Sequence, residues 1–231
     1  MLKKWLCLLR GKKEFDKLWS YGDFNKDRFL GEVKGEGFIT FEELIGLVVL
    51  TKGKSLNNES TWLKFLINVD YVDDVEHYKE IYIAKTPILY GISWDDLCKK
   101  QLVSTNLDFC GKREICINGT YYHVRLLKGL NTLYQESCDK TYYSEWDRTI
   151  CKLLISEKSF SNIQQHYNYK DLGIVHEDYL GCYNWCQETS KEDINLKLVR
   201  GFRTPDSKSL IDKTLRYSFY GWRPVLEKCV K

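Results

Sequence analysis

Two stretches of the chain alternate apolar and polar residues with the period of a half-buried β-strand. Residues 62–68 and 80–84 carry apolar side chains on alternate positions in part of their length, and this alternation predicts two strands. A third signal is an Asn-Gly pair at 118–119, which separates residues 114–117 from residues 120–126. Asn-Gly between alternating segments is the strongest short-range hairpin signal, so we expect a twisted antiparallel sheet that carries this hairpin.

Three other segments carry the start signals of short helices. Thr40 and Glu43 have the spacing of a capping box, in which two side chains satisfy backbone groups at the start of a helix. They predict a helix from Phe41 to about Leu50, which Gly53 ends. The other two predicted helices start after serine N-caps: Ser93, with Asp96 at the third helical position, and Ser144, before a helix that reaches about Leu154.

A polar, turn-rich segment from Lys52 to Thr61 separates the first predicted helix from the strands. We place a domain boundary there, with a small helical or irregular attachment segment at 1–60 and a larger domain at 61–231. Residues 5–19 predict an amphipathic helix, which either docks on its own domain or contacts a partner subunit. The apolar run inside it ends at Arg10, too early for a signal peptide, whose apolar region needs about 7–15 residues.

Composition narrows the classes of partner. The 231 residues are 43% hydrophobic, 29% charged and 14% aromatic, as in a soluble globular protein with a proper core. The net charge is only +3 and the pI about 8.2, whereas dedicated nucleic-acid-binding domains have a pI above about 9. No stretch approaches the roughly 20 apolar residues that span a bilayer. We therefore expect neither nucleic-acid binding nor membrane insertion.

Residue types that bind metals or catalyse reactions are scattered. The nine cysteines are an odd number without a C-x-x-C pair, and without an export signal reduced, mostly buried thiols are expected. A zinc site that combines them with His123 or His176 lacks the usual ligand spacing. Residues 23–34 and 32–43 resemble calcium loops but lack several oxygen ligands. Phosphate-loop, nucleophile-elbow and zincin motifs are absent from the sequence, so we expect no cofactor, no metal and no catalytic residue.

Aromatic residues and arginines stand together in short blocks along the second part of the chain. A buried guanidinium must be paired or fully hydrogen-bonded, because it cannot be deprotonated. We therefore expect Arg125, Arg200 and Arg223 to be buried and bonded to backbone carbonyls or to acids such as Glu145 or Glu188. In order, the blocks are T-P-I-L-Y-G-I-S-W-D-D-L at 86–97, Y-H-V-R-L-L at 122–127, S-E-W-D at 144–147, N-W-C-Q-E at 184–188, L-V-R-G-F at 198–202, L-R-Y at 215–217 and G-W-R-P-V-L at 221–226.

This order of blocks resembles the formylglycine-generating (sulfatase-modifying-factor) domain, which is a variant of the C-type lectin-like fold. The closer likeness is to lectin-like proteins of phages and prophages of low-GC Gram-positive bacteria, over about residues 62–228. Three positions depart from the family pattern: Leu127 stands for its Pro, Phe202 for its second Gly and Trp222 for its Phe. These departures concern mainly the geometry of loops.

The resemblance implies an α+β fold with a C-type lectin-like domain and a function in the virion, at the tail or another host-facing position. The implied partners are other virion proteins and a host cell-surface glycan or protein, and homo-oligomerisation stays open. One alternative is a virion decoration or assembly protein without a ligand. Another is a formylglycine-type oxidase, but residues 202–220 lack the cysteine pair that such enzymes use to hold copper.

The resemblance also implies where a ligand would bind. In lectin-like phage proteins, the segment that corresponds to Arg203–Lys213 is displayed at the surface and contacts the target. Here it is polar with mixed charge, which suits a polyol or a peptide better than a phosphate backbone. Tyr217 and Phe219 either flank this site or belong to the core. The residues expected to form one exposed ligand-binding patch are Tyr183, Arg203, Asp206, Lys208, Asp212 and Tyr220.

Overall fold

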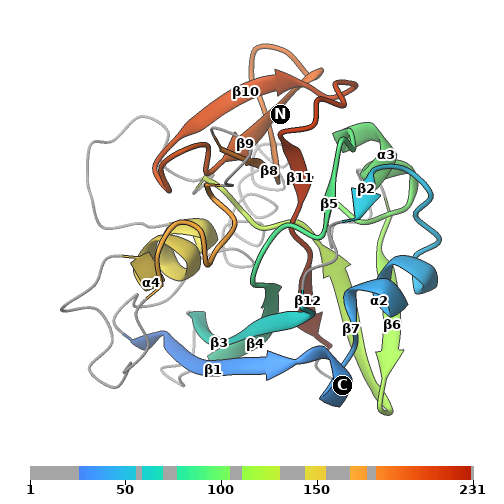
Figure 1. Ribbon diagram of the computed structural model, residues 1–231, viewed down its shortest axis with the longest axis vertical. Coiled ribbons are helices and arrows are strands. Elements are labelled where there is room, and N and C mark those ends of the chain that lie inside the picture. Colours follow the sequence, from blue (N-terminus) through green and yellow to red (C-terminus); the bar gives the residue numbers. More distant parts are fainter. Residues whose placement is uncertain are drawn as a thin grey trace, which may run out of the picture.

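Two six-stranded β-sheets with short helices make up the part of the chain that the computed structural model describes (Figure 1). This combination confirms the α+β class. The described residues are 26–55, 59–69, 77–104, 111–130, 144–154, 167–175 and 181–229. Among these residues, no helix is both long and apolar enough to cross a membrane.

The first sheet, sheet A, has the strand order β1-β3-β4-β12-β7-β6, and every neighbouring pair is antiparallel. The predicted hairpin is confirmed, with Asn118 and Gly119 at φ values of 48° and 77°, as a tight two-residue turn requires. The two predicted strands are confirmed and extend further than expected. The strands are β1 Arg28–Lys34, β3 Thr61–Val69, β4 His77–Ala84, β6 Arg113–Ile117, β7 Thr120–Arg125 and β12 Val225–Lys228.

The second sheet, sheet B, has the order β10-β9-β8-β11-β5-β2, in which only the β8–β11 pair is parallel. The second part of the segment predicted as an exposed loop, 203–213, forms the edge strand β10. Edge strands carry polar residues because one side meets water, so composition did not distinguish this strand from a loop. The strands are β2 Lys54–Ser55, β5 Leu89–Tyr90, β8 Tyr183–Thr189, β9 Leu196–Arg200, β10 Lys208–Asp212 and β11 Tyr220–Trp222.

The helices start where the sequence predicts. Thr40 and Glu43 form both bonds of the capping box, and Ser93 does the same with Asp96. Ser144 accepts a bond from the backbone N–H of residue 147 and makes the third cap. The first helix ends earlier than expected, and the third contains a π-helical turn. The helical segments are η2 Gly35–Gly37, α2 Phe41–Leu47, α3 Trp94–Lys99, η3 Asp147–Cys151 and α4 Lys152–Leu154.

Both faces of sheet A are buried along much of β3 and β4. One face shares a core with sheet B and with α2 and α3, and includes Trp62, Tyr122, Trp185 and Trp222. The other face packs under η3 and α4 around Trp146. Burial on both faces explains why the alternation of apolar residues in these strands is incomplete.

The expected division at 52–61 does not separate two cores in the described residues. Strand β1 pairs with β3 from Arg28 to Lys34, and Phe41 and Leu44 of α2 belong to the core between the sheets. Residues 26–55 are therefore part of the same folded unit as the residues that follow. The predicted amphipathic helix at 5–19 lies outside the described residues.

Candidate ligand-binding surface

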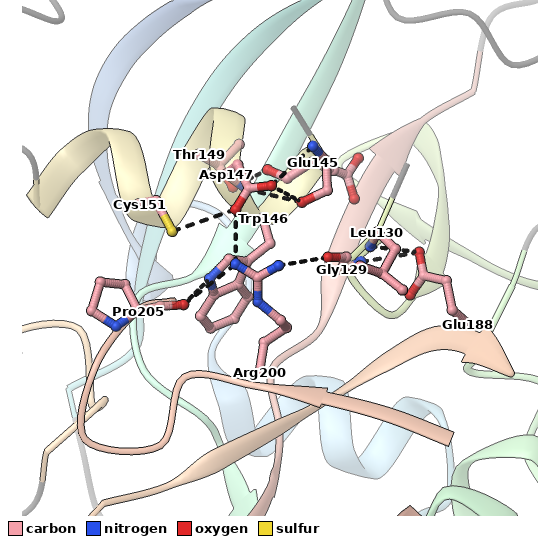
Figure 2. Close-up of polar contacts among 11 residues, drawn as sticks. Gly129, Leu130, Glu145, Trp146, Asp147, Thr149, Cys151, Glu188, Arg200 and Pro205 are labelled. Atoms are coloured by element: carbon pink, nitrogen blue, oxygen red, sulfur yellow. Dashed lines mark hydrogen bonds and ion pairs between the residues drawn. The ribbon is translucent and has the colours of Figure 1, made fainter. Parts of the chain in front are cut away.

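Arg200, the last residue of β9, anchors the start of the loop between β9 and β10. Its guanidinium donates to the Gly129 carbonyl at 2.7 Å and to Asp147 Oδ1 at 2.8 Å. Trp146 Nε1 donates to the carbonyl of Pro205, within the loop, at 2.9 Å. Figure 2 shows Arg200 and Trp146 side by side between the helix and this loop. The loop therefore leaves the sheet from a rigid base.

Glycine at position 201 is required by this base. Its φ is +88°, and a Cβ there would lie 2.8 Å from the Trp146 ring. Both facts exclude a larger residue without rearrangement of the loop. The Arg-Gly pair of the sequence block thus combines a bonded guanidinium with a close backbone approach to tryptophan.

The predicted burial of the other two arginines is also confirmed. Arg125 donates to both carboxylate oxygens of Glu145, at 2.7 and 2.6 Å, and to Glu227 at 2.7 Å. Arg223 is fully buried and bonds neutral oxygens: Asn184 Oδ1 at 3.0 Å, the Lys85 carbonyl at 2.7 Å and the Leu172 carbonyl. These bonds tie sheets A and B to the loops between them.

Glu188 differs from the prediction, because its bonds in the structure are to backbone N–H groups. The amides of Gly129 and Leu130 donate to its carboxylate at 3.0 and 3.2 Å (Figure 2). Burial raises the pKa of Glu188 to about 7, although these amide bonds oppose the shift. Glu188 is thus a carboxyl group that exchanges its proton near neutral pH, beside the base of the loop.

Next to the loop lies a group of rings that contact one another, which we call the aromatic surface: Tyr183, Phe202, Tyr217, Phe219 and Tyr220. Tyr183 stacks on Phe202 with ring centroids 4.7 Å apart, and Tyr217 stacks on Phe219 at 5.5 Å. Tyr220 contacts both pairs, at 6.0 Å from Tyr183 and 4.8 Å from Phe219. Tyr217 is 54% exposed, whereas Tyr220 is buried. The rings thus form a continuous layer with a buried centre and an exposed outer edge.

The segment that carries Tyr217 is held by α3 as well as by the sheet. Arg216 donates two bonds to Asp96, at 2.6 and 2.9 Å, and this pairing lowers the pKa of that carboxyl group. The amide of Tyr183 donates to the Phe219 carbonyl at 2.8 Å, and the amide of Asp95 to the Lys213 carbonyl at 3.1 Å. Backbone and side-chain bonds together position the exposed rings.

Arg203 belongs to the same surface. Its guanidinium lies over the Phe202 ring, 5.2 Å from the centroid, and its backbone has a φ of 63°. A residue with a side chain is uncommon in this left-handed region, and such strained positions occur often at binding sites. Arg203 therefore presents five donors at the edge of the rings.

The structure splits the six predicted binding residues into two groups. Residues on adjacent positions of a strand point to opposite faces, and paired residues point to the same face. Lys208 and Asn184 both pair with Arg200, so Lys208 lies on the face opposite Tyr183. Asp212 follows on the same face as Lys208, at the far end of β10, where its carboxylate bonds Thr214.

The prediction of one exposed patch is therefore wrong in two respects. Asp206 lies on the helix side, close enough to Cys151 for its charge to add to burial, the main cause of the raised pKa of that thiol. Tyr220, expected at the surface, is 4% exposed. Of the six predicted residues, only Tyr183, Arg203 and Tyr220 belong to the aromatic surface. Asp206, Lys208 and Asp212 were included only because they are close in sequence. The sequence did not reveal β10, in which successive side chains point to opposite faces of the sheet.

Two residues were not expected to have a role here. Phe202, a member of the aromatic surface, was noted only as a departure from the family pattern, and Arg216, which holds the segment of Tyr217, only as part of a block. A large ring at a position where the family has glycine is the signal that could have identified Phe202. Tyr217 is exposed, so the alternative that placed it in the core is wrong.

The thiols of the described residues are mostly unreactive. Burial raises the pKa of Cys151 and Cys182 to about 12 and that of Cys186 well above its ordinary value, so the nucleophilic thiolate is disfavoured. Cys98 is disulfide-bonded, which corrects the expectation of reduced thiols at this position. The burial expected of most cysteines fails at Cys116, which is exposed.

No protein-family model, no curated protein and no solved structure matches this chain. The lectin-like resemblance therefore rests on the sequence blocks. What the structure adds is their arrangement: the four block tryptophans Trp94, Trp146, Trp185 and Trp222 are all buried, and the rings beside them form a partly exposed layer.

Proposed function

We propose that this protein is a binding protein whose aromatic surface holds a carbohydrate ligand. The observation that carries the proposal is the layer of stacked rings with Tyr217 54% exposed and the Arg203 donors at its edge. Sugar rings stack on aromatic faces while polar groups fixed nearby read their hydroxyls. A surface that already holds its rings in place loses little entropy when it binds.

The sequence blocks support a narrower proposal, a C-type lectin-like domain in a phage or prophage virion. Their arginines and tryptophans form the buried frame under the aromatic surface, as expected for residues that carry a loop-rich fold. The partners would be other virion proteins and a host cell-surface glycan or protein. The small net charge of +3 gives no support for a nucleic-acid partner.

The formylglycine-type oxidase is the less supported alternative. Residues 202–220 contain no cysteine, and the buried thiols nearby have raised pKa values, whereas a copper ligand must be a thiolate. Ligand binding distinguishes a binding protein from a decoration protein without a ligand. Mass spectrometry of purified phage particles would test the proposed location in the virion.

An array of bacterial cell-surface polysaccharides tests the binding proposal. We expect the wild-type protein to bind a subset of them. Tyr217→Ala should weaken that binding about fivefold or more, because a base stacked on an aromatic side chain is worth about 1–3 kcal/mol and a sugar ring stacks on the same kind of face. Tyr169→Ala is the matched control, since Tyr169 is 41% exposed and outside the aromatic surface. Failure of the wild-type protein to bind any array member would favour the decoration protein. Equal losses in both variants would remove the aromatic surface as the site.

A further inference from the structure

A second group of chemically active side chains lies on sheet A, away from the aromatic surface. Glu114 of β6, His123 of β7 and Cys229 just beyond β12 have their ligand atoms within 4.8 Å of one another. Figure 1 shows the β6–β7 hairpin beside β12 at the end of the chain. The pairing of Glu114 and Glu227 with His123 places these strands side by side.

The sheet register brings the three ligands to one face. Paired residues of neighbouring strands point the same way, and positions two apart on a strand do so as well. Glu114 and Glu227 both pair with His123, and Cys229 lies two residues after Glu227. The Cys229 amide also donates to the Tyr121 carbonyl at 2.9 Å, which extends the β7–β12 pairing by one bond and holds the thiol beside the imidazole.

The three ligand atoms lie close enough to share one tetrahedral metal ion. His123 Nδ1 is 3.4 Å from Glu114 Oε1 and 3.6 Å from Cys229 Sγ. Zinc bonds of about 2.3 Å to sulfur, 2.0–2.1 Å to nitrogen and 2.0–2.2 Å to oxygen, at tetrahedral angles, separate nitrogen from oxygen by about 3.4 Å and from sulfur by about 3.6 Å. The nitrogen–oxygen separation matches an edge of such a tetrahedron. Sγ also lies 3.4 Å from Nε2, so the thiol or the imidazole rotates about its side-chain bonds when the metal binds.

The same geometry argues against a nucleophilic cysteine. A general base must face the thiol along one hydrogen bond. Cys229 Sγ lies 3.4 Å from Nε2 and 3.6 Å from Nδ1, so it is aligned with the lone pair or N–H bond of neither nitrogen. Sulfur, nitrogen and oxygen ligands together are a set that divalent metals of the zinc class bind.

We propose that Glu114, His123 and Cys229 bind one divalent transition-metal ion of the zinc class, with the fourth position open to solvent. His123 is largely buried, with 13% of its side chain exposed, whereas Glu114 is 48% exposed, so the ion enters from the Glu114 side. Lys112 Nζ lies 3.2 Å from Glu114 Oε1 and moves aside when the ion binds. The bound ion links Cys229 to the β6–β7 hairpin. The site is separate from the aromatic surface.

Titration of the metal-free full-length protein with Co²⁺ under nitrogen tests the site, because a cobalt–thiolate bond gives a near-ultraviolet charge-transfer band. We expect one equivalent to bind with this band. Cys229→Ser should abolish the band, and His123→Gln and Glu114→Gln should weaken binding at least about tenfold. Cys116→Ser is the matched control, since Cys116 is an exposed free thiol of β6 outside the three-residue group.

Far-ultraviolet circular dichroism establishes that each variant is folded before titration. A wild-type protein that binds no Co²⁺, or that binds without the charge-transfer band, overturns the proposal. So does an unchanged band in Cys229→Ser or its loss in Cys116→Ser. Competition with Zn²⁺, which is expected to displace Co²⁺ and bleach the band, then establishes the preference for the zinc class.

Discussion

At the scale of single residues, the molecule depends on buried guanidinium groups that each join several segments. Arg125 is paired with two carboxylates, Arg200 with one carboxylate and two carbonyls, and Arg223 with neutral oxygens only. Burial lowers the pKa of Arg223 to about 10, so it is still charged at neutral pH. Its charge is stabilised by oriented dipoles of the backbone.

We therefore expect Arg223→Ala to abolish soluble folding. The substitution leaves several buried oxygens without donors, each at a cost of about 1–3 kcal/mol, and whole domains are stable by only about 5–15 kcal/mol. The soluble fraction after expression and the thermal melting temperature measure the effect. Arg28→Ala, at an exposed arginine of β1, is the control and should melt like the wild-type protein. A folded Arg223→Ala variant with wild-type stability would contradict the assignment.

Glu188 predicts how stability depends on pH. Its folded pKa of about 7 lies above the ordinary glutamate value, so the folded state holds the proton more tightly than the unfolded state. Its contribution to stability is complete below the ordinary value, about 4.3, and is lost as the pH rises to 7. We expect the free energy of unfolding to fall by about 1–3 kcal/mol over this interval through Glu188.

The variant Glu188→Gln should lack that part of the pH dependence, as measured by urea unfolding at several pH values. Glu192→Gln, at an exposed position, should retain it. Lys128 acts in the opposite direction above pH 7, because burial lowers its pKa to about 7, so the comparison belongs between pH 4.5 and 7. Identical slopes for Glu188→Gln and the wild-type protein would place the titrating group elsewhere.

At the scale of elements, the sequence predicted what local chemistry decides. The capping boxes at Thr40 and Ser93 and the hairpin turn at Asn118 depend on residues within three positions of one another, and all are confirmed. Strand β10 depends on a partner, because its polar residues form a strand only through the backbone bonds that β9 offers. The pairing with β9 also decides on which face of the sheet Lys208 lies. The residues next to Lys208 in the sequence do not indicate this pairing.

The pairing of Arg216 with Asp96 should govern how firmly the exposed rings are held. Arg216 is half exposed, whereas Asp96 is buried but keeps the bonds of its capping box, so Arg216→Ala should lower the melting temperature only modestly. Hydrogen exchange of the amides at 217–219 should become faster, and carbohydrate binding weaker. Lys99→Ala, at an exposed basic residue of α3, is the control. Unchanged exchange in Arg216→Ala would mean that the backbone bonds alone position the segment.

At the scale of the whole molecule, sheet B has two faces with different roles. The Tyr183 face carries the aromatic surface and part of the common core, and the Arg200 face rests on the helix and carries the polar rim of β10. The sequence could indicate that residues 203–213 are at the surface. It could not indicate which side of the sheet they occupy, since a shift of one residue in register reverses every side chain.

This arrangement gives a test that separates the two faces. The double variant Asp206→Ala with Lys208→Ala should melt like the wild-type protein, because both residues are exposed and surface changes usually stay within about 0.5 kcal/mol. It should also retain carbohydrate binding, because its side chains lie away from the aromatic surface. Loss of binding in this variant, at wild-type stability, would show that the site extends around the edge of β10.

The order of strands in both sheets has a consequence for how the protein is made. Strand β12 lies between β4 and β7, and β11 lies between β8 and β5, although these strands are the last two in the sequence. Until the ribosome has released the segment through Lys228, each sheet is two separate pieces with unpaired inner edges. Domains generally fold as units, and transiently unpaired edges are prone to aggregate. Nascent chains of this protein should therefore depend on chaperones until translation passes the last strand.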